Sequence, residues 1–182
     1  KAAADIINRE FIPGPHGMRY LSLGSLHLHF PGHKEAEGYY RDLNIADAVA
    51  TTRYSVGGVT YTRKTFASLQ DGVVVMRIEA SEAAKLNMSL SFDSPFEHNV
   101  TAKKNQLHVA VRNVGHEGVP ASLTAQCVIR VMADGKTVAG KNTLDISGAT
   151  AATIIVSAAT NFVNYHDVSG NALKKAESYL KA

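Results

Sequence analysis

Alternation of apolar and polar residues, the repeat of a β-strand, dominates this chain. Residues 20–30, YLSLGSLHLHF, show it most clearly, because Leu26, Leu28 and Phe30 fall on one face of an extended strand. The apolar parity changes at Gly24, which predicts a bulge or bend at that position. We therefore expect the three apolar side chains to be buried in a core and the residues between them to face outward.

Short β-rich runs continue through most of the sequence, with Gly, Asn, Asp and Pro between them. Runs 41–56 and 59–69 are separated by Gly57 and Gly58, and this predicts a hairpin because glycine tolerates the positive φ of tight turns. Further strands are expected at 72–81, 85–95, 106–113, 122–135, 143–147 and 151–160. This close spacing is typical of an all-β fold, an antiparallel β-sandwich, and not of alternating β and α elements.

Helical patterns occur near the two ends of the chain. KAAADIINREF opens it, and NALKKAESYLKA closes it with Asn171 as the expected N-cap. The predicted division is a helical lead-in at 1–16, a β-sandwich domain at 17–166, and a linker with the start of a helix at 167–182.

The closing helix carries an apolar stripe, formed by Leu173, Ala176 and Leu180 at helical spacing. We expect the partner surface of this stripe to lie outside the chain. Lys1 stands where an initiator methionine would be, so we also expect the chain to be a fragment of a longer protein.

The amino-acid composition excludes some classes of function. The chain has 182 residues, of which 45% are hydrophobic and 19% charged, which is typical of a globular protein. Its 19 Lys and Arg are interspersed with 16 Asp and Glu, without a basic stripe, so nucleic-acid binding is not expected. No run approaches the roughly 18 apolar residues of a membrane span. The single cysteine, Cys127, lies in an apolar run and is expected to be buried.

Three histidines, His27, His29 and His33, fall within seven positions. On a strand His27 and His29 project from the same face, and His33 could return as a third zinc ligand after the Pro31-Gly32 turn. The simpler interpretation is that the first two occupy the outward face of a strand. It is favoured because zinc sites need three or four converging ligands. We therefore predict no metal and no cofactor, and keep a metal-binding β-protein as an alternative.

Enzyme motifs are sparse. The sequence contains no Gly-rich phosphate loop, no G-x-S-x-G elbow and no C-x-x-C. Glycosidases use paired carboxylates, and the nearest pairs here are Glu35 with Glu37 and Asp93 with Glu97. Both pairs lie in hydrophilic, turn-like surroundings, so we assign no catalytic residue.

The order of motifs resembles the N-terminal β-sandwich of glycoside hydrolase family 95, a family of α-L-fucosidases and some α-L-galactosidases. The resemblance covers roughly residues 17–166 and ends in IIVSAATNFVNY, which is similar to the family's last sandwich strand. The matching residues are Leu23, Gly24, Leu26, Leu28 and Phe30; Tyr40, Arg41, Leu43 and Ala48; and Tyr54, Gly58, Tyr61, Arg63, Phe66, Ala67, Ser68, Val73, Val75 and Arg77. Ser25 and Lys64 depart from the family, which has acidic residues at both positions.

The resemblance implies a super-sandwich fold and a non-catalytic role. In family 95 a following (α/α)6 barrel carries the general acid and the water-activating residues, and none of those motifs is present here. We expect a parent enzyme that is an inverting exo-α-L-fucosidase, periplasmic or secreted, that acts on fucosylated or related glycans. The chain alone should be inactive. The family's first sandwich strands are also missing, which would expose sheet edges and favour self-association.

An autonomous carbohydrate-binding module is a further alternative. Such modules present aromatic platforms, but this chain has no Trp and only 7% aromatic residues. The available aromatic side chains are Tyr39, Tyr40, Tyr54 and Tyr61, and tyrosines in strands are more often packing residues. For contacts with a neighbouring domain or with the rim of a glycan site, the candidates are His29, His33 and Tyr39.

Overall fold

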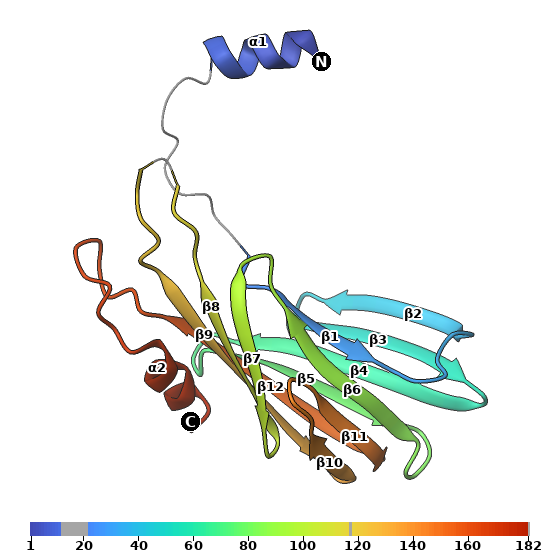
Figure 1. Ribbon diagram of the computed structural model, residues 1–182. Helices are drawn as coiled ribbons and strands as arrows, with labels where there is room; N and C mark the ends of the chain where they lie inside the picture. Colours follow the sequence, from blue (N-terminus) through green and yellow to red (C-terminus); the bar gives the residue numbers. More distant parts are fainter. Residues whose placement is uncertain (12–21, 117, 182) are drawn as a thin grey trace.

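The computed structural model describes residues 1–11, 22–116 and 118–181. Within these ranges it is a two-layer antiparallel β-sandwich with short helices at both ends (Figure 1). The all-β prediction is therefore confirmed. The predicted boundary between residues 16 and 17, and the first two residues of the strand expected at 20–30, lie outside the described residues.

A sheet of four strands packs on a sheet of eight. The small sheet has the order β1-β6-β11-β10, with bounds β1 Ser25–His29, β6 Leu86–Asp93, β10 Lys136–Ala139 and β11 Leu144–Ala149. The large sheet has the order β2-β3-β4-β5-β12-β9-β8-β7. Its bounds are β2 Glu37–Asn44, β3 Val49–Val56, β4 Val59–Ser68, β5 Val73–Ala80, β7 Glu97–Lys103, β8 Gln106–Arg112, β9 Thr124–Ala133 and β12 Ala151–Thr160.

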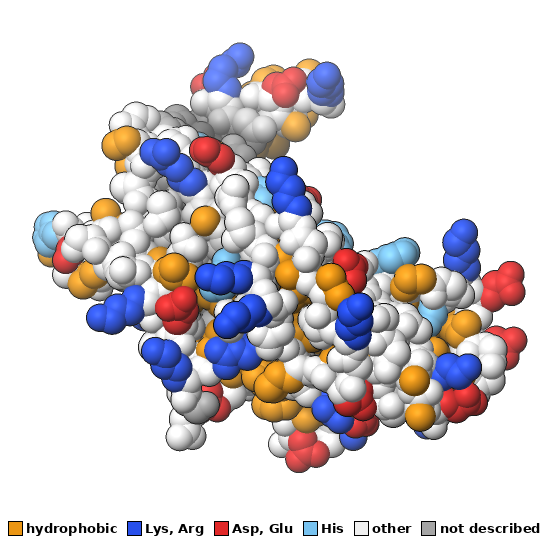
Figure 2. Space-filling model, turned by 60° about the horizontal axis from the view of Figure 1, so that its bottom comes forward, with side chains coloured by type: hydrophobic (Ala, Val, Ile, Leu, Met, Phe, Trp, Pro, Cys, Tyr) orange, Lys and Arg blue, Asp and Glu red, His pale blue; other side chains and the backbone are white. Residues whose placement is uncertain are grey.

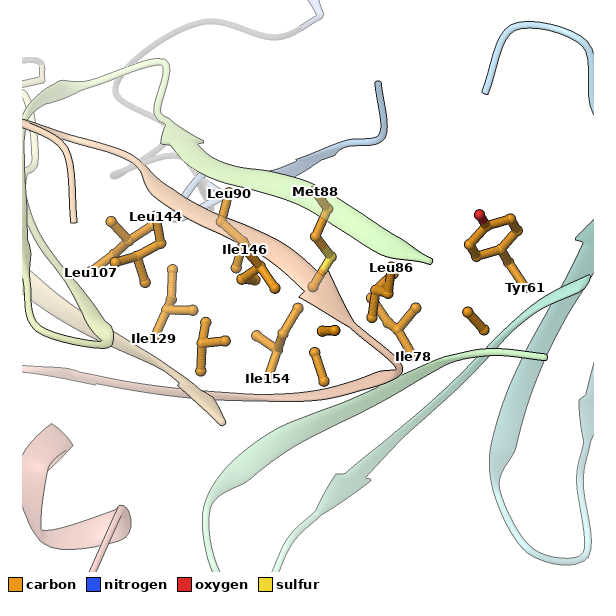
Figure 3. Packing of buried hydrophobic residues seen from close by; sticks show 14 of the residues in the cluster. Tyr61, Ile78, Leu86, Met88, Leu90, Leu107, Ile129, Leu144, Ile146 and Ile154 are labelled. Atoms are coloured by element: carbon orange, nitrogen blue, oxygen red, sulfur yellow. The ribbon is translucent and has the colours of Figure 1, made fainter. Parts of the chain in front are cut away.

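The core lies between the two sheets and consists mainly of aliphatic side chains (Figure 3). Leu90 and Leu144 from the small sheet and Leu107 and Ile154 from the large sheet are fully buried. Cys127 belongs to this core, as predicted, and its burial raises the pKa of the thiol to about 12. A large apolar area is thus removed from water without any ionised group, which is the main stabilising contribution to such a fold.

The predicted hairpin at Gly57 and Gly58 is confirmed. Val56 pairs with Val59 across the turn, and the two glycines have φ values of 56° and 83°. Both values are positive, as a primed two-residue turn requires.

The run at 41–56, in contrast, is not one strand. It is divided between β2 and β3 by a turn after Asn44, whose side-chain oxygen accepts hydrogen bonds from the backbone N–H groups of Ala46 and Asp47. Ala48 completes the turn with a φ of 53°. Two further strands, β7 and β10, were not among the expected segments.

The helices are α1, Ala2–Glu10, and α2, Ala172–Tyr179. The Asn171 side chain accepts a hydrogen bond from the Lys174 N–H at 2.9 Å, which confirms the predicted N-cap. The expectation that the partner of α2 lies outside the chain was wrong. Ala176 and Leu180 are buried against the outer face of the large sheet, next to Val128 of β9. In the described ranges no helix is long and apolar enough to cross a membrane.

Candidate functional site

β1 places the first two histidines as the alternation predicts. His27 and His29 are exposed, whereas Leu26 and Leu28 pack against the core. The two leucines are half-buried and not fully buried as expected. Among the described residues β1 is an edge strand that pairs with β6 alone, and side chains at a sheet edge are less fully covered than those of a central strand.

His33 lies in the turn after β1 and has a different environment. Its Nδ1 atom is 2.9 Å from the hydroxyl oxygen of Tyr54. Its ring packs on Phe30 and Tyr61, with centroid distances of 5.3 and 4.4 Å. Partial burial among these rings lowers the pKa of His33. This histidine therefore joins the turn to β3 and β4 as a packing residue.

The described residues provide no set of ligands for the metal site that the histidines suggested. No three His, Cys, Asp or Glu side chains in the described part of the chain are grouped so that they could hold a metal ion. His27, His29 and His33 therefore do not form such a group, and Nδ1 of His33 is engaged by Tyr54.

The tyrosines divide into a packed pair and an exposed pair. Tyr54 and Tyr61 stack at 5.6 Å, and the Tyr61 hydroxyl donates to the Lys85 carbonyl. Burial raises the pKa of both phenols. The space beside them is about 10 Å³, enough for about one water molecule and far too small for a sugar ring. Tyr39 and Tyr40 are 63% and 50% exposed on the edge strand β2.

The carboxylates that the sequence offered as glycosidase pairs lie on the protein surface. Glu35, Glu37, Asp93 and Glu97 are all exposed, as the sequence suggested. A general acid needs a raised pKa. The pKa values of two carboxyls elsewhere are instead lowered. Backbone N–H groups of Ala151 and Thr150 lower the pKa of Asp134, and hydrogen bonds from Ser169 lower that of Asp167.

Charge is mixed on the surface shown in Figure 2, where Lys and Arg side chains are interspersed with Asp and Glu. This distribution agrees with the net charge of +3. On this face the molecule lacks the single-sign surface that a nucleic-acid-binding protein presents.

Sequence reasoning missed a surface at the end of β12. Residues 161–170, termed here the apolar loop, follow β12 and lead to α2. A groove of about 510 Å³ lies between this loop and α2, lined by Thr160, Phe162, Val163, Gly170, Asn171, Lys174, Lys175 and Ser178. The apolar run Phe162-Val163 beyond the strand was the one available signal, and it was assigned to the end of the sandwich.

The fold defines a class: a two-layer antiparallel β-sandwich domain, whose described residues include no group of three side chains that could hold a metal ion. Residues 1–165 match the family described as "Glycosyl hydrolase family 65, N-terminal domain". The match covers most of the chain, which therefore belongs to this family.

Two curated proteins carry fucosidase names. The chain is 38% identical over 93 residues to "Alpha-L-fucosidase 2" of Arabidopsis thaliana, a match that covers 48% of this chain and 11% of the relative. It is 26% identical over 147 residues to "Probable alpha-fucosidase A" of Aspergillus oryzae, covering 78% of this chain and 20% of that protein. The matched segment thus spans a fifth or less of either relative.

Among solved structures, one similar chain is described as "Putative kojibiose phosphorylase from human microbiome". It has a TM-score of 0.45 and 12% sequence identity, and the match covers 79% of this chain and 21% of that chain.

Proposed function

We propose that this chain is the non-catalytic N-terminal β-sandwich of an α-L-fucosidase-like glycoside hydrolase. The observation that carries the proposal is the 38% identity with a protein named alpha-L-fucosidase, in a segment of a chain that matches a glycosyl hydrolase N-terminal family. In the finer form of the proposal, the parent enzyme belongs to family 95, inverts configuration and removes terminal α-L-fucose.

The non-catalytic role is supported by the chemistry of the described side chains. Inverting hydrolysis needs an acid and a base carboxyl about 6.5–9.5 Å apart beside a sugar-sized site. Glu97 lines a groove of about 360 Å³ beside β7 and β8, but no second carboxylate is among the residues that line it. The aromatic cluster of Phe30, His33, Tyr54 and Tyr61 is packed closed. The sandwich would then support a catalytic (α/α)6 barrel supplied by another part of the polypeptide.

The proposal also includes the cellular location of the parent enzyme and the self-association of this chain. A glycan-degrading enzyme of this kind would act in the periplasm or outside the cell. Within the described residues β1 and β2 are edge strands of their sheets, and β2 exposes Tyr39, Tyr40 and Leu43. Such an edge favours self-association when it is not covered.

The experiment is a substrate survey on the complete gene product that contains this chain. We expect hydrolysis of an aryl α-L-fucoside, with little action on the matched β-L-fucoside and α-D-glucoside. Proton NMR should show β-L-fucose as the first product, because inversion releases the opposite anomer. Hydrolysis of the α-D-glucoside alone would contradict the fucosidase assignment, and release of the α-anomer would contradict inversion.

A glycan array probed with this chain alone addresses the autonomous binding module. Fucose-dependent binding by the isolated chain would favour the module. Binding that requires the complete gene product would favour the accessory-domain proposal.

A further inference from the structure

The apolar loop displays hydrophobic side chains to solvent. Phe162, Val163, Tyr165 and Val168 are 48%, 53%, 84% and 37% exposed. In Figure 1 this loop is the red segment that projects beside α2, away from the core between the sheets. Clustered apolar exposure on a short loop is characteristic of contact surfaces, whereas single exposed hydrophobic residues need no explanation.

Side-chain hydrogen bonds hold the loop in one conformation. The Asn161 amide donates to the carbonyl oxygens of Ser122 and Val168, at 3.0 and 2.7 Å. Its oxygen accepts from the Thr124 N–H at 2.9 Å. Two of these bonds tie Asn161 to the segment that begins β9, and the third ties it to Val168 near the other end of the loop.

The tip of the loop is fixed in the same way. Asn164 and Asp167 form an isolated antiparallel bridge, and Asp167 also accepts a hydrogen bond from the Ser169 N–H at 2.8 Å. The backbone that carries the exposed apolar side chains is therefore already ordered. A partner that covers them would not need to order the backbone, which is a large part of the usual cost of binding.

The side chains that line the groove between the loop and α2 favour a partner of complementary chemistry. Phe162 and Val163 form its apolar wall, and Lys174 and Lys175 belong to the α2 side. A complementary surface would place apolar side chains against the loop and carboxylates near the two lysines.

We propose that the apolar loop and this groove form the docking surface for the domain that follows in the same polypeptide. Two observations favour this occupant over others. The family is described as an N-terminal domain and the matched segment covers 11% and 20% of the relatives, so their remaining length lies mostly beyond it. The loop also leads directly into α2, so chain that continues after α2 emerges beside the groove. The inference rests on the proposed membership in a larger hydrolase.

Cysteine labelling tests the proposal with a matched control. Tyr165→Cys places a thiol on the loop, and Leu69→Cys places one at a remote position that is 98% exposed. The native Cys127 is buried, with a thiol pKa of about 12, and stays silent. In the isolated chain both new thiols should react with a maleimide at similar rates. In the complete gene product, labelling at residue 165 should slow about tenfold or more, while residue 69 stays unchanged.

Several results would overturn the proposal. Equal labelling of residue 165 in the chain and in the complete product would show that nothing covers the loop. Protection in the isolated chain that grows with concentration would assign the surface to a second copy. A gene product with no further domain would also contradict it.

Fucosidase activity is scored separately, so the two proposals fail independently. Protection of residue 165 in a product that does not cleave α-L-fucosides would keep the docking surface and remove the sugar assignment. Cleavage of α-L-fucosides by a product in which residue 165 is unprotected would keep the sugar assignment and remove the docking surface.

Discussion

The Nδ1 atom of His33 lies 2.9 Å from the hydroxyl oxygen of Tyr54, and this contact joins the turn after β1 to strand β3. It links the small sheet to the large one at the end of the sandwich where Phe30 and Tyr61 also pack. A histidine that the sequence offered as a metal ligand therefore acts as a connection between the layers.

This environment predicts a pH dependence of stability. Burial lowers the pKa of His33, so the folded state holds fewer protons than the unfolded state as pH falls through the ordinary histidine value of 6.5. Stability should then rise with pH through this region and be lost on acidification. Urea unfolding between about pH 5 and pH 8 measures the slope, and His33→Phe should flatten it. An unchanged slope in this variant would contradict the assignment, with the exposed His27→Phe as control.

The cost of substitutions in β1 and in its neighbour β6 should follow the burial of the substituted side chain. Leu90→Ala, at a fully buried position, should cost about 2–5 kcal/mol of unfolding free energy. Leu28→Ala, half-buried on the edge strand, should cost about 1–2 kcal/mol. His27→Ala should cost less than about 0.5 kcal/mol. Chemical denaturation of the three variants gives the order, and a larger loss for His27 than for Leu28 would show that the register of β1 is wrong.

Gly24 should tolerate no side chain. Its φ is 149°, and a Cβ atom there would collide with the Asp93 carbonyl oxygen and the Phe92 ring. Gly24→Ala should cost about 3 kcal/mol through strain and displacement of β1 from β6. Gly57→Ala is the matched control, because its φ is also positive but its Cβ would meet open space. It should cost about 1 kcal/mol. Equal midpoints for the two variants would contradict the close approach at Gly24.

Asn161 should contribute more to the stability of the fold than its partly exposed position suggests. Asn161→Ala removes three hydrogen bonds to the loop and to the start of β9. We expect a loss of about 1–3 kcal/mol and faster hydrogen exchange across residues 161–170. Asn164→Ala, which removes one side-chain bond to the His166 N–H, should have a smaller effect. Unchanged exchange in the Asn161 variant would mean that the loop is held by other contacts.

Much of the fold could be predicted because local signals agreed with tertiary structure. Gly57 and Gly58 specify the β3–β4 turn, Asn171 caps α2, and the alternation along β1 sets its faces. Each of these depends on a few neighbouring residues. The β2–β3 turn was missed because it contains no Gly or Pro. Asn44 and the positive φ of Ala48 make that turn instead.

The candidate surface was harder to predict because it depends on contacts that are distant in sequence. Asn161 fixes the apolar loop through Ser122 and Thr124, nearly forty positions earlier, and no periodic pattern indicates that contact. The partner of α2 was misjudged for the same reason. Val128 lies on the outer face of the large sheet, and only the strand order shows that the helix covers it.

The most direct test of the account compares this chain with the complete gene product in one fucosidase assay. Both proteins would be purified to the same standard and incubated at equal molar concentration with an aryl α-L-fucoside. The account predicts hydrolysis by the complete product and none above the blank by residues 1–182. Turnover by this chain alone, with contaminating enzyme excluded, would contradict the proposal that the sandwich is non-catalytic. An inactive complete product would contradict its assignment to a fucosidase.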